Sequence, residues 1–333
     1  MRRFYSNRCS AFIRWMMMLA VAILPQAARA QWHATVGAQS TEMGRQALAF
    51  LPNEIWIHAG DTVTWKFEAG EIHTVTFLAT SPTAQVRPPF FVGCPGFSSD
   101  PASFDGSACV STPPLVKGAT FTVTFPAAGN FKLACLVHPD MTGVVHVLEL
   151  SKPLPHTQDF YDNEAEAQAR ALLSDADSDE EQNVVIHDQA DHQVFAGTGE
   201  ISTNPGGAST LSVVRFIGDT MVIHAGQTVE WDSDDPENPH TITFAAEPTG
   251  DPFPPSRNVT TDADGALHAV INSTSDSVHS GFIFAAPQER TGLTQSRLSV
   301  TRFRVTFTHP GTYPYICALH DNLGMKGKII VLP

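Results

Sequence analysis

The chain has 333 residues, and its 20 Lys and Arg against 34 Asp and Glu give a formal net charge of −14 at pH 7. This acidic balance makes nucleic acid and anionic membranes poor partners, because both repel a negative surface. The length exceeds that of one typical domain and allows two hydrophobic cores.

Residues 1–30 have the layout of a cleavable export signal. A basic start is followed by the short apolar run "WMMMLAVAIL" and then by Ala28, Arg29 and Ala30. The apolar run is shorter than the roughly 20 residues that a membrane span needs. The sequence therefore predicts cleavage near Ala30 and a periplasmic or secreted protein, and no later segment resembles a membrane span.

An internal repeat organises the rest of the chain. The stretch "IWIHAGDTVTW" at 55–65 returns at 221–231 as "MVIHAGQTVEW", and "HTVTF" from His73 returns as "HTITF" from His240. Alternation of apolar and polar residues, with Gly and Pro between the runs, is typical of β-strands and turns. We therefore predict two all-β domains, at 31–150 and 183–333.

The segments outside the repeat are a linker and two inserts. The linker, 151–182, opens with prolines and is predicted to contain one short helix at about 158–174, followed by a solvated acidic tail at 175–181. The inserts, at about 79–118 and 246–299, are long connections of a kind that is usually either functional or disordered. The sequence does not decide between these alternatives.

The five cysteines separate into three groups. Cys9 belongs to the predicted signal, and Cys135 and Cys317 lie at equivalent places in the repeat. The remaining two, Cys94 and Cys109, should form a disulfide in an oxidising compartment.

The two repeated cysteines each begin a compact cluster of possible metal ligands. The first cluster reads "ACLVHPDM" at 134–141 and the second reads "ICALHDNLGM" at 316–325. With a histidine from an upstream strand, each supplies one thiolate, two imidazoles and one weak thioether, which is the ligand set of a type 1, or blue, copper centre. A rigid loop between strands suits both copper oxidation states, so little has to move when an electron arrives.

These motifs resemble those of the cupredoxins, the blue copper family that includes plastocyanin, pseudoazurin and amicyanin. The first spacing, Cys-x2-His-x2-Met, is similar to that of amicyanin, and the second, Cys-x2-His-x4-Met, to that of plastocyanin and pseudoazurin. The resemblance implies an all-β fold with two Greek-key cupredoxin β-sandwich domains, which the acidic, partly helical linker would join. It also implies two copper ions per chain, with the ligands His73, Cys135, His138, Met141, His240, Cys317, His320 and Met325.

Two tandem units also occur in copper enzymes of the nitrite reductase and multicopper oxidase types. Those enzymes bind further copper between domains, partly through a histidine beside the type 1 cysteine, but here Ala134 and Leu136 flank Cys135, while Ile316 and Ala318 flank Cys317. The favoured hypothesis is therefore an electron carrier rather than an enzyme. The alternatives are a copper enzyme with an unrecognised interdomain copper site and a copper-sequestering or delivery protein.

The resemblance also predicts where electrons pass. The histidine of each Cys-x2-His turn, His138 or His320, should lie at an exposed end of its domain beside an apolar surface, while His73 and His240 should lie deeper. The acidic charge either serves solubility or steers the protein toward a redox partner such as a basic cytochrome.

Overall fold

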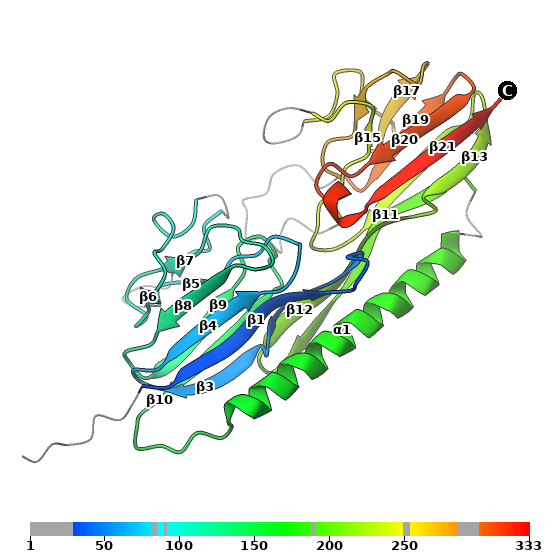
Figure 1. The fold of residues 1–333 in the computed structure, drawn as a ribbon. Coiled ribbons are helices and arrows are strands. Elements are labelled where there is room, and N and C mark those ends of the chain that lie inside the picture. Colours follow the sequence, from blue (N-terminus) through cyan, green and yellow to red (C-terminus); the bar gives the residue numbers. More distant parts are fainter. Residues whose placement is uncertain (1–28, 81–84, 90–91, 188–190, 249–253, 286–299) are drawn as a thin grey trace, which may run out of the picture.

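The computed structural model describes residues 29–333, except for 81–84, 90–91, 188–190, 249–253 and 286–299. Almost all of the predicted export signal lies outside the described residues. The predicted all-β architecture is confirmed, because two β-sandwiches follow one another along the chain and a single long helix connects them (Figure 1).

The first sandwich consists of one sheet in the order β2-β1-β4-β8-β6 and a second in the order β3-β10-β9-β5-β7. Its strands are β1 Gln31–Gln39, β2 Arg45–Leu51, β3 Glu54–His58, β4 Thr62–Phe67, β5 Thr76–Phe77, β6 Ala102–Ser103, β7 Val110–Ser111, β8 Thr120–Thr124, β9 Gly129–Ala134 and β10 Thr142–Leu148.

The second sandwich repeats this arrangement, with sheets in the orders β12-β11-β14-β19-β17-β16 and β13-β21-β20-β15-β18. A short 3-10 turn, Asp321–Leu323, lies in the loop before its last strand. The strands are β11 Gln193–Asn204, β12 Gly207–Ile217, β13 Thr220–His224, β14 Thr228–Asp234, β15 Thr243–Phe244, β16 Thr260–Thr261, β17 Leu267–Ile271, β18 Val278–His279, β19 Arg302–Phe307, β20 Gly311–Ile316 and β21 Lys326–Leu332.

The core of each sandwich follows from the alternating pattern of its strands. In β4 every second residue, Val63, Trp65 and Phe67, is buried, and the residues between them are more exposed. Trp231 of β14 occupies the equivalent place in the second sandwich, where it packs against Phe244. Each sandwich therefore has its own core and holds its loops on a rigid frame.

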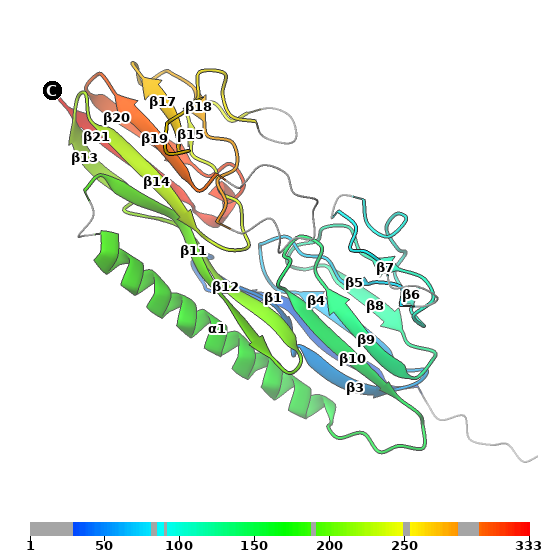
Figure 2. The ribbon, with the colours of Figure 1, turned by 180° about the vertical axis from the view of Figure 1, so that it is seen from behind.

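The two sandwiches are not separate bodies, since one continuous sheet of 11 strands runs through both. Strand β2 of the first pairs antiparallel with β12 of the second, with Leu48 opposite Thr210 and Arg45 opposite Val213. The long strands β11 and β12 reach from the second sandwich to the first (Figures 1 and 2). The sequence predicts domains joined by the linker alone, and this pairing was not predicted.

The connecting helix, α1 Gln158–His187, is longer than predicted. The acidic stretch 175–181 continues the helix instead of forming a separate tail, and most of its residues are exposed. Arg45 of β2 forms ion pairs with Asp177 and Glu180, so part of this acidic charge is neutralised by the first sandwich. The predicted domain limits, 31–150 and 183–333, stay predictions.

Helix α1 contacts both sandwiches. Near its start, the Tyr161 hydroxyl accepts a hydrogen bond from the Trp56 amide at 2.9 Å, and near its end Asp179 accepts one from the Thr198 hydroxyl at 2.8 Å. Between these points Leu172 and Ala176 are buried against β2 and β12. The helix therefore covers the seam between the domains.

The described parts of both inserts contain strands that extend the sheets. The first contributes β6 and β7 to the sheet edges, and the second contributes β16, β17 and β18. The predicted disulfide between Cys94 and Cys109 is confirmed, with 5.3 Å between the Cα atoms. Within the part of the chain that the structure describes, no helix combines the length and apolar character that a membrane crossing requires.

We expect Leu172→Ala to lower the free energy of unfolding by about 2 kcal/mol or more, because it removes a buried side chain at the seam. Denaturant unfolding of the full chain measures this loss. Val185→Ala is the control, since this valine of the same helix is 58% exposed and its truncation should change stability by less than about 0.5 kcal/mol. Equal losses in the two variants would show that the seam contributes nothing.

Candidate metal centres

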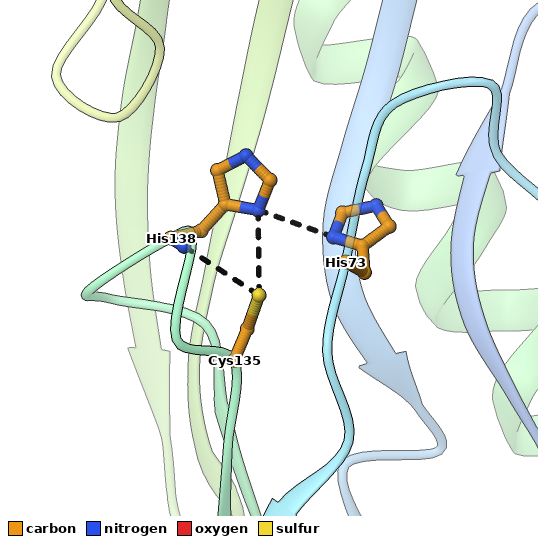
Figure 3. A group of neighbouring side chains, drawn as sticks. All are labelled: His73, Cys135 and His138. Atoms are coloured by element: carbon orange, nitrogen blue, oxygen red, sulfur yellow. Dashed lines mark hydrogen bonds between the residues drawn. The ribbon is translucent and has the colours of Figure 1, made fainter. Parts of the chain in front are cut away.

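The first candidate centre brings together His73, Cys135 and His138, all fully buried. His73 follows the loop after β4, and the other two lie in the loop between β9 and β10. The Nδ1 atoms of His73 and His138 are 3.1 Å apart, and His138 Nδ1 is 3.6 Å from Cys135 Sγ (Figure 3). A histidine and a Cys-x2-His pair that is distant from it in sequence thus converge on one point.

The second centre repeats this geometry with His240, Cys317 and His320. The two Nδ1 atoms are 3.2 Å apart, and Cys317 Sγ lies 3.5 Å from His320 Nδ1 and 4.0 Å from His240 Nδ1. All three side chains are buried. The internal repeat of the sequence is therefore a repeat of the candidate site.

The predicted fourth ligands, Met141 and Met325, are both fully buried in the cores next to these groups. Each closes its loop through the backbone, because the Cys135 amide donates to the Met141 carbonyl at 3.0 Å and the Cys317 amide donates to the Met325 carbonyl at 3.1 Å. This places each methionine beside its cysteine. The role of the thioethers as ligands stays a prediction.

Backbone contacts hold the ligands in place. His73 exchanges two backbone hydrogen bonds with Leu115, at 2.9 and 2.8 Å, and His240 makes the same exchange with Ile283 at 2.9 Å. The amide of the residue after each histidine, Thr74 or Thr241, donates to the cysteine sulfur at 3.4 Å. Leu115 and Ile283 lie within the inserts, so each insert helps to position a histidine.

The electrostatics of both centres favour thiolates. Burial raises the pKa of Cys135, but the hydrogen bond and the charge of His138 outweigh burial and bring the pKa well below its usual value. Burial also raises the pKa of Cys317, but the charge of His320 and the hydrogen bond of His240 outweigh burial and bring this pKa well below its usual value. The thiolate is the form of cysteine that binds metals.

The donor set fits a copper ion. In each centre both imidazoles turn the same atom, Nδ1, toward the sulfur and toward each other. Two buried ring nitrogens at about 3 Å need a proton or a cation between them. Thiolate and imidazole together suit copper and zinc, and a nearby thioether adds preference for the cuprous state.

Two glycines that the sequence analysis did not single out pack against the strand-borne histidines. Gly37 and Gly197 sit at equivalent β-bulges of β1 and β11, with φ of 67° and 77°. A Cβ at Gly37 would lie 2.8 Å from His73 Nε2, and one at Gly197 would lie 2.0 Å from His240 Nε2. Their shared place in the repeat is the signal that could have identified them.

The two centres face each other across the domain interface. His138 Nε2 donates to Asn238 Oδ1 of the second domain at 3.0 Å, and His320 Nε2 lies 3.3 Å from Glu71 Oε2 of the first. Asn238 stands two residues before His240, and Glu71 stands two residues before His73. Each turn histidine thus contacts the loop that carries the strand histidine of the other domain.

This arrangement makes the predicted exposure of the turn histidines wrong. His138 is 0% exposed and His320 is 3% exposed, because the opposite domain covers each of them. His320 nevertheless lines a pocket of about 350 Å³ at the interface, together with apolar residues of both domains. These apolar lining residues include Ile72, Val116, Pro239, Phe282, Phe284 and Leu319.

Comparison with known proteins identifies a copper-binding family. A sequence model of the copper binding proteins of the plastocyanin/azurin family matches residues 37–148 and again residues 206–332. A mutant plastocyanin of fern is 20% identical, with 42% of this chain and 99% of that chain covered and a TM-score of 0.23. A reduced amicyanin mutant is 22% identical, with 35% and 82% covered and a TM-score of 0.24.

We expect Gly197→Ala to weaken metal binding at the second centre by roughly tenfold or more, since the new methyl would displace the His240 ring. Gly37→Ala should act in the same way on the first centre alone. Copper titration of each variant, followed by absorption, measures the loss.

Gly226→Ala is the matched control for these two changes. Its φ of 93° imposes similar backbone strain, but no atom lies within 4 Å of the added Cβ. Unchanged copper binding in Gly197→Ala, or equal loss in Gly226→Ala, would contradict a specific role for these bulges.

Proposed function

Because the chain belongs to the plastocyanin/azurin family of copper-binding proteins, we propose that it is an electron-transfer protein with one type 1 copper ion in each domain. One observation carries this proposal: a buried group of two histidines and one cysteine occurs twice, with equivalent geometry, in one chain. Met141 and Met325 complete the two proposed ligand sets. A bound copper ion would supply reversible uptake of one electron at each site.

The protein residues supply rigidity and exclude water. The ligands of each site come from a loop between paired strands and from a histidine whose backbone is fixed in a β-bridge. All three ligating groups are buried, so solvent does not compete for the metal. A site whose ligands cannot move favours fast electron transfer, because little reorganisation accompanies the change of charge.

The proposed location is the periplasm or the extracellular space. The export-signal pattern of residues 1–30 and the Cys94–Cys109 disulfide support this location, since disulfides persist in oxidising compartments. The net charge of −14 favours a basic redox partner such as a basic cytochrome.

The alternative function is a copper enzyme of the nitrite reductase or multicopper oxidase type. It needs copper ligands beyond the two proposed sets, and it gains support from the way the two centres meet at a domain interface. Copper counting with paramagnetic resonance separates the alternatives. Two blue coppers per chain support the carrier, and an additional non-blue copper supports the enzyme.

We expect Cys135→Ser to remove one blue absorption signal and leave the other, and Cys317→Ser to do the reverse, because each domain has its own thiolate. Copper content should fall from two ions to one in both variants. Loss of both signals in either well-folded variant would mean that the coppers share a site, and the enzyme would then be the better hypothesis.

We expect His320→Gly to lose its blue signal and to recover much of it with added imidazole, since His320 lines the interdomain pocket. His138→Gly is the matched control. His138 is fully buried and is not among the residues that line this pocket, so rescue should be slower. Visible absorption after imidazole addition measures both, and equal rates would show that the pocket does not give access to the second site.

A further inference from the structure

The two centres differ in what surrounds the outer nitrogens of their histidines. In the second centre His240 Nε2 lies 3.4 Å from Asp235 Oδ2, and His320 Nε2 lies 3.3 Å from Glu71 Oε2. Both carboxylates are buried, with Asp235 at 0% and Glu71 at 7% exposure. Each of the two imidazoles therefore has an acidic group at its outer nitrogen.

The first centre has uncharged surroundings at the same positions. His138 Nε2 bonds the neutral amide of Asn238 at 3.0 Å. Within the described ranges of the chain, His73 Nε2 has no hydrogen-bond partner. Of the four histidine Nε2 atoms, the two of the second centre each lie beside a carboxylate, and the two of the first centre do not.

A half-buried cation adds to this difference. The Arg87 guanidinium donates to the backbone carbonyl of Cys135 and to that of Pro139, the latter at 3.1 Å. It therefore places positive charge at the backbone of the loop that carries Cys135. Arg215 donates to Leu323 in the second loop at 2.8 Å, but it bonds no proposed ligand and also contacts the Glu42 carbonyl.

The other acidic groups near the centres do not reverse this difference. Each loop carries one aspartate, Asp140 in the first and Asp321 in the second, so their effects are comparable. Glu237 lies near His138 and accepts a hydrogen bond from the Asp140 amide at 2.9 Å, and burial raises its pKa to about 8, which disfavours its charged form. Glu71 also acts on the first centre through space, but its direct contact is with His320.

We propose that the second centre has the lower reduction potential, and that Asp235 and Glu71 set this order. The inference rests on the proposed function, namely one copper ion at each centre. Oxidation adds one positive charge to a site. Carboxylates at the outer nitrogens stabilise that charge by making the imidazoles more basic, and the Arg87 guanidinium opposes it.

The consequence is a direction for electrons within the molecule. When the protein holds one electron, that electron resides at the first centre, and the second centre stays oxidised. The interdomain pocket reaches His320 of the second centre. A donor that binds at this pocket would therefore reduce the second centre. Transfer of the electron from the second centre to the first would then be downhill.

The test is a redox titration of the full chain with both coppers bound, followed by absorption and paramagnetic resonance. Two one-electron steps are expected. Cys317→Ser, which keeps the first centre, should show the higher potential, and Cys135→Ser, which keeps the second, should show the lower. A tenfold difference in the ratio of cupric to cuprous affinity corresponds to about 59 mV.

Charge-neutral variants test the cause of this order. Glu71→Gln and Asp235→Asn should each raise the potential of the second centre by roughly one tenfold step, or about 59 mV, and change the first centre less. Asn238→Asp is the reciprocal variant, because it adds a carboxylate at His138 and should lower the potential of the first centre. Asp235 also holds the Glu237 and Asn238 amides, so Glu71→Gln is the cleaner variant.

The outcomes separate the two proposals. A chain that binds fewer than two blue coppers would overturn the proposed function and this inference with it. Two blue coppers with equal or reversed potentials would overturn the inference and leave the function intact. Two coppers in the expected order, with no response to Glu71→Gln or to Asn238→Asp, would show that these side chains do not set the order.

Discussion

The pairing of β2 with β12 is the contact on which the rest of the structure depends. It joins the two sandwiches edge to edge into one 11-stranded sheet and satisfies backbone groups that an unpaired edge strand would leave open. Helix α1 covers the seam and contacts both domains. With the sheet continuous, the two ligand loops meet at the interface, and each turn histidine is buried by the opposite domain.

Because the turn histidines are buried at the interface, each domain contributes a side chain to the surroundings of the other domain's centre. The resemblance predicts this histidine at an exposed end of each domain, but Glu71 and Asn238 reach across the interface to His320 and His138. These two residues hold equivalent positions in the repeat, two before the strand histidine. A carboxylate at one position and an amide at the other give two similar sites different electrostatic surroundings.

The sequence predicts what is local and repeated, and it misses what depends on contacts between distant segments. Alternating strands, the cysteine loops and the disulfide follow from short patterns. The continuation of α1 through its acidic end was missed because Arg45, which pairs with Asp177 and Glu180, comes from a distant strand. The same limit applies to Glu71, whose partner His320 is brought near only by the edge-to-edge pairing.

The hydrogen-bond partners of the Nε2 atoms also explain which ring nitrogen faces the candidate metal site. Asn238 offers its amide oxygen to His138 while its NH2 group donates to Ser212, and Asp235 and Glu71 present only acceptors. Each of these three acceptors requires a hydrogen at Nε2, so the lone pair of a neutral ring lies on Nδ1. A buried carboxylate that lost such a donor would be costly. Folding of the interface therefore fixes the tautomer that points the Nδ1 lone pairs of His138, His240 and His320 into the candidate metal sites.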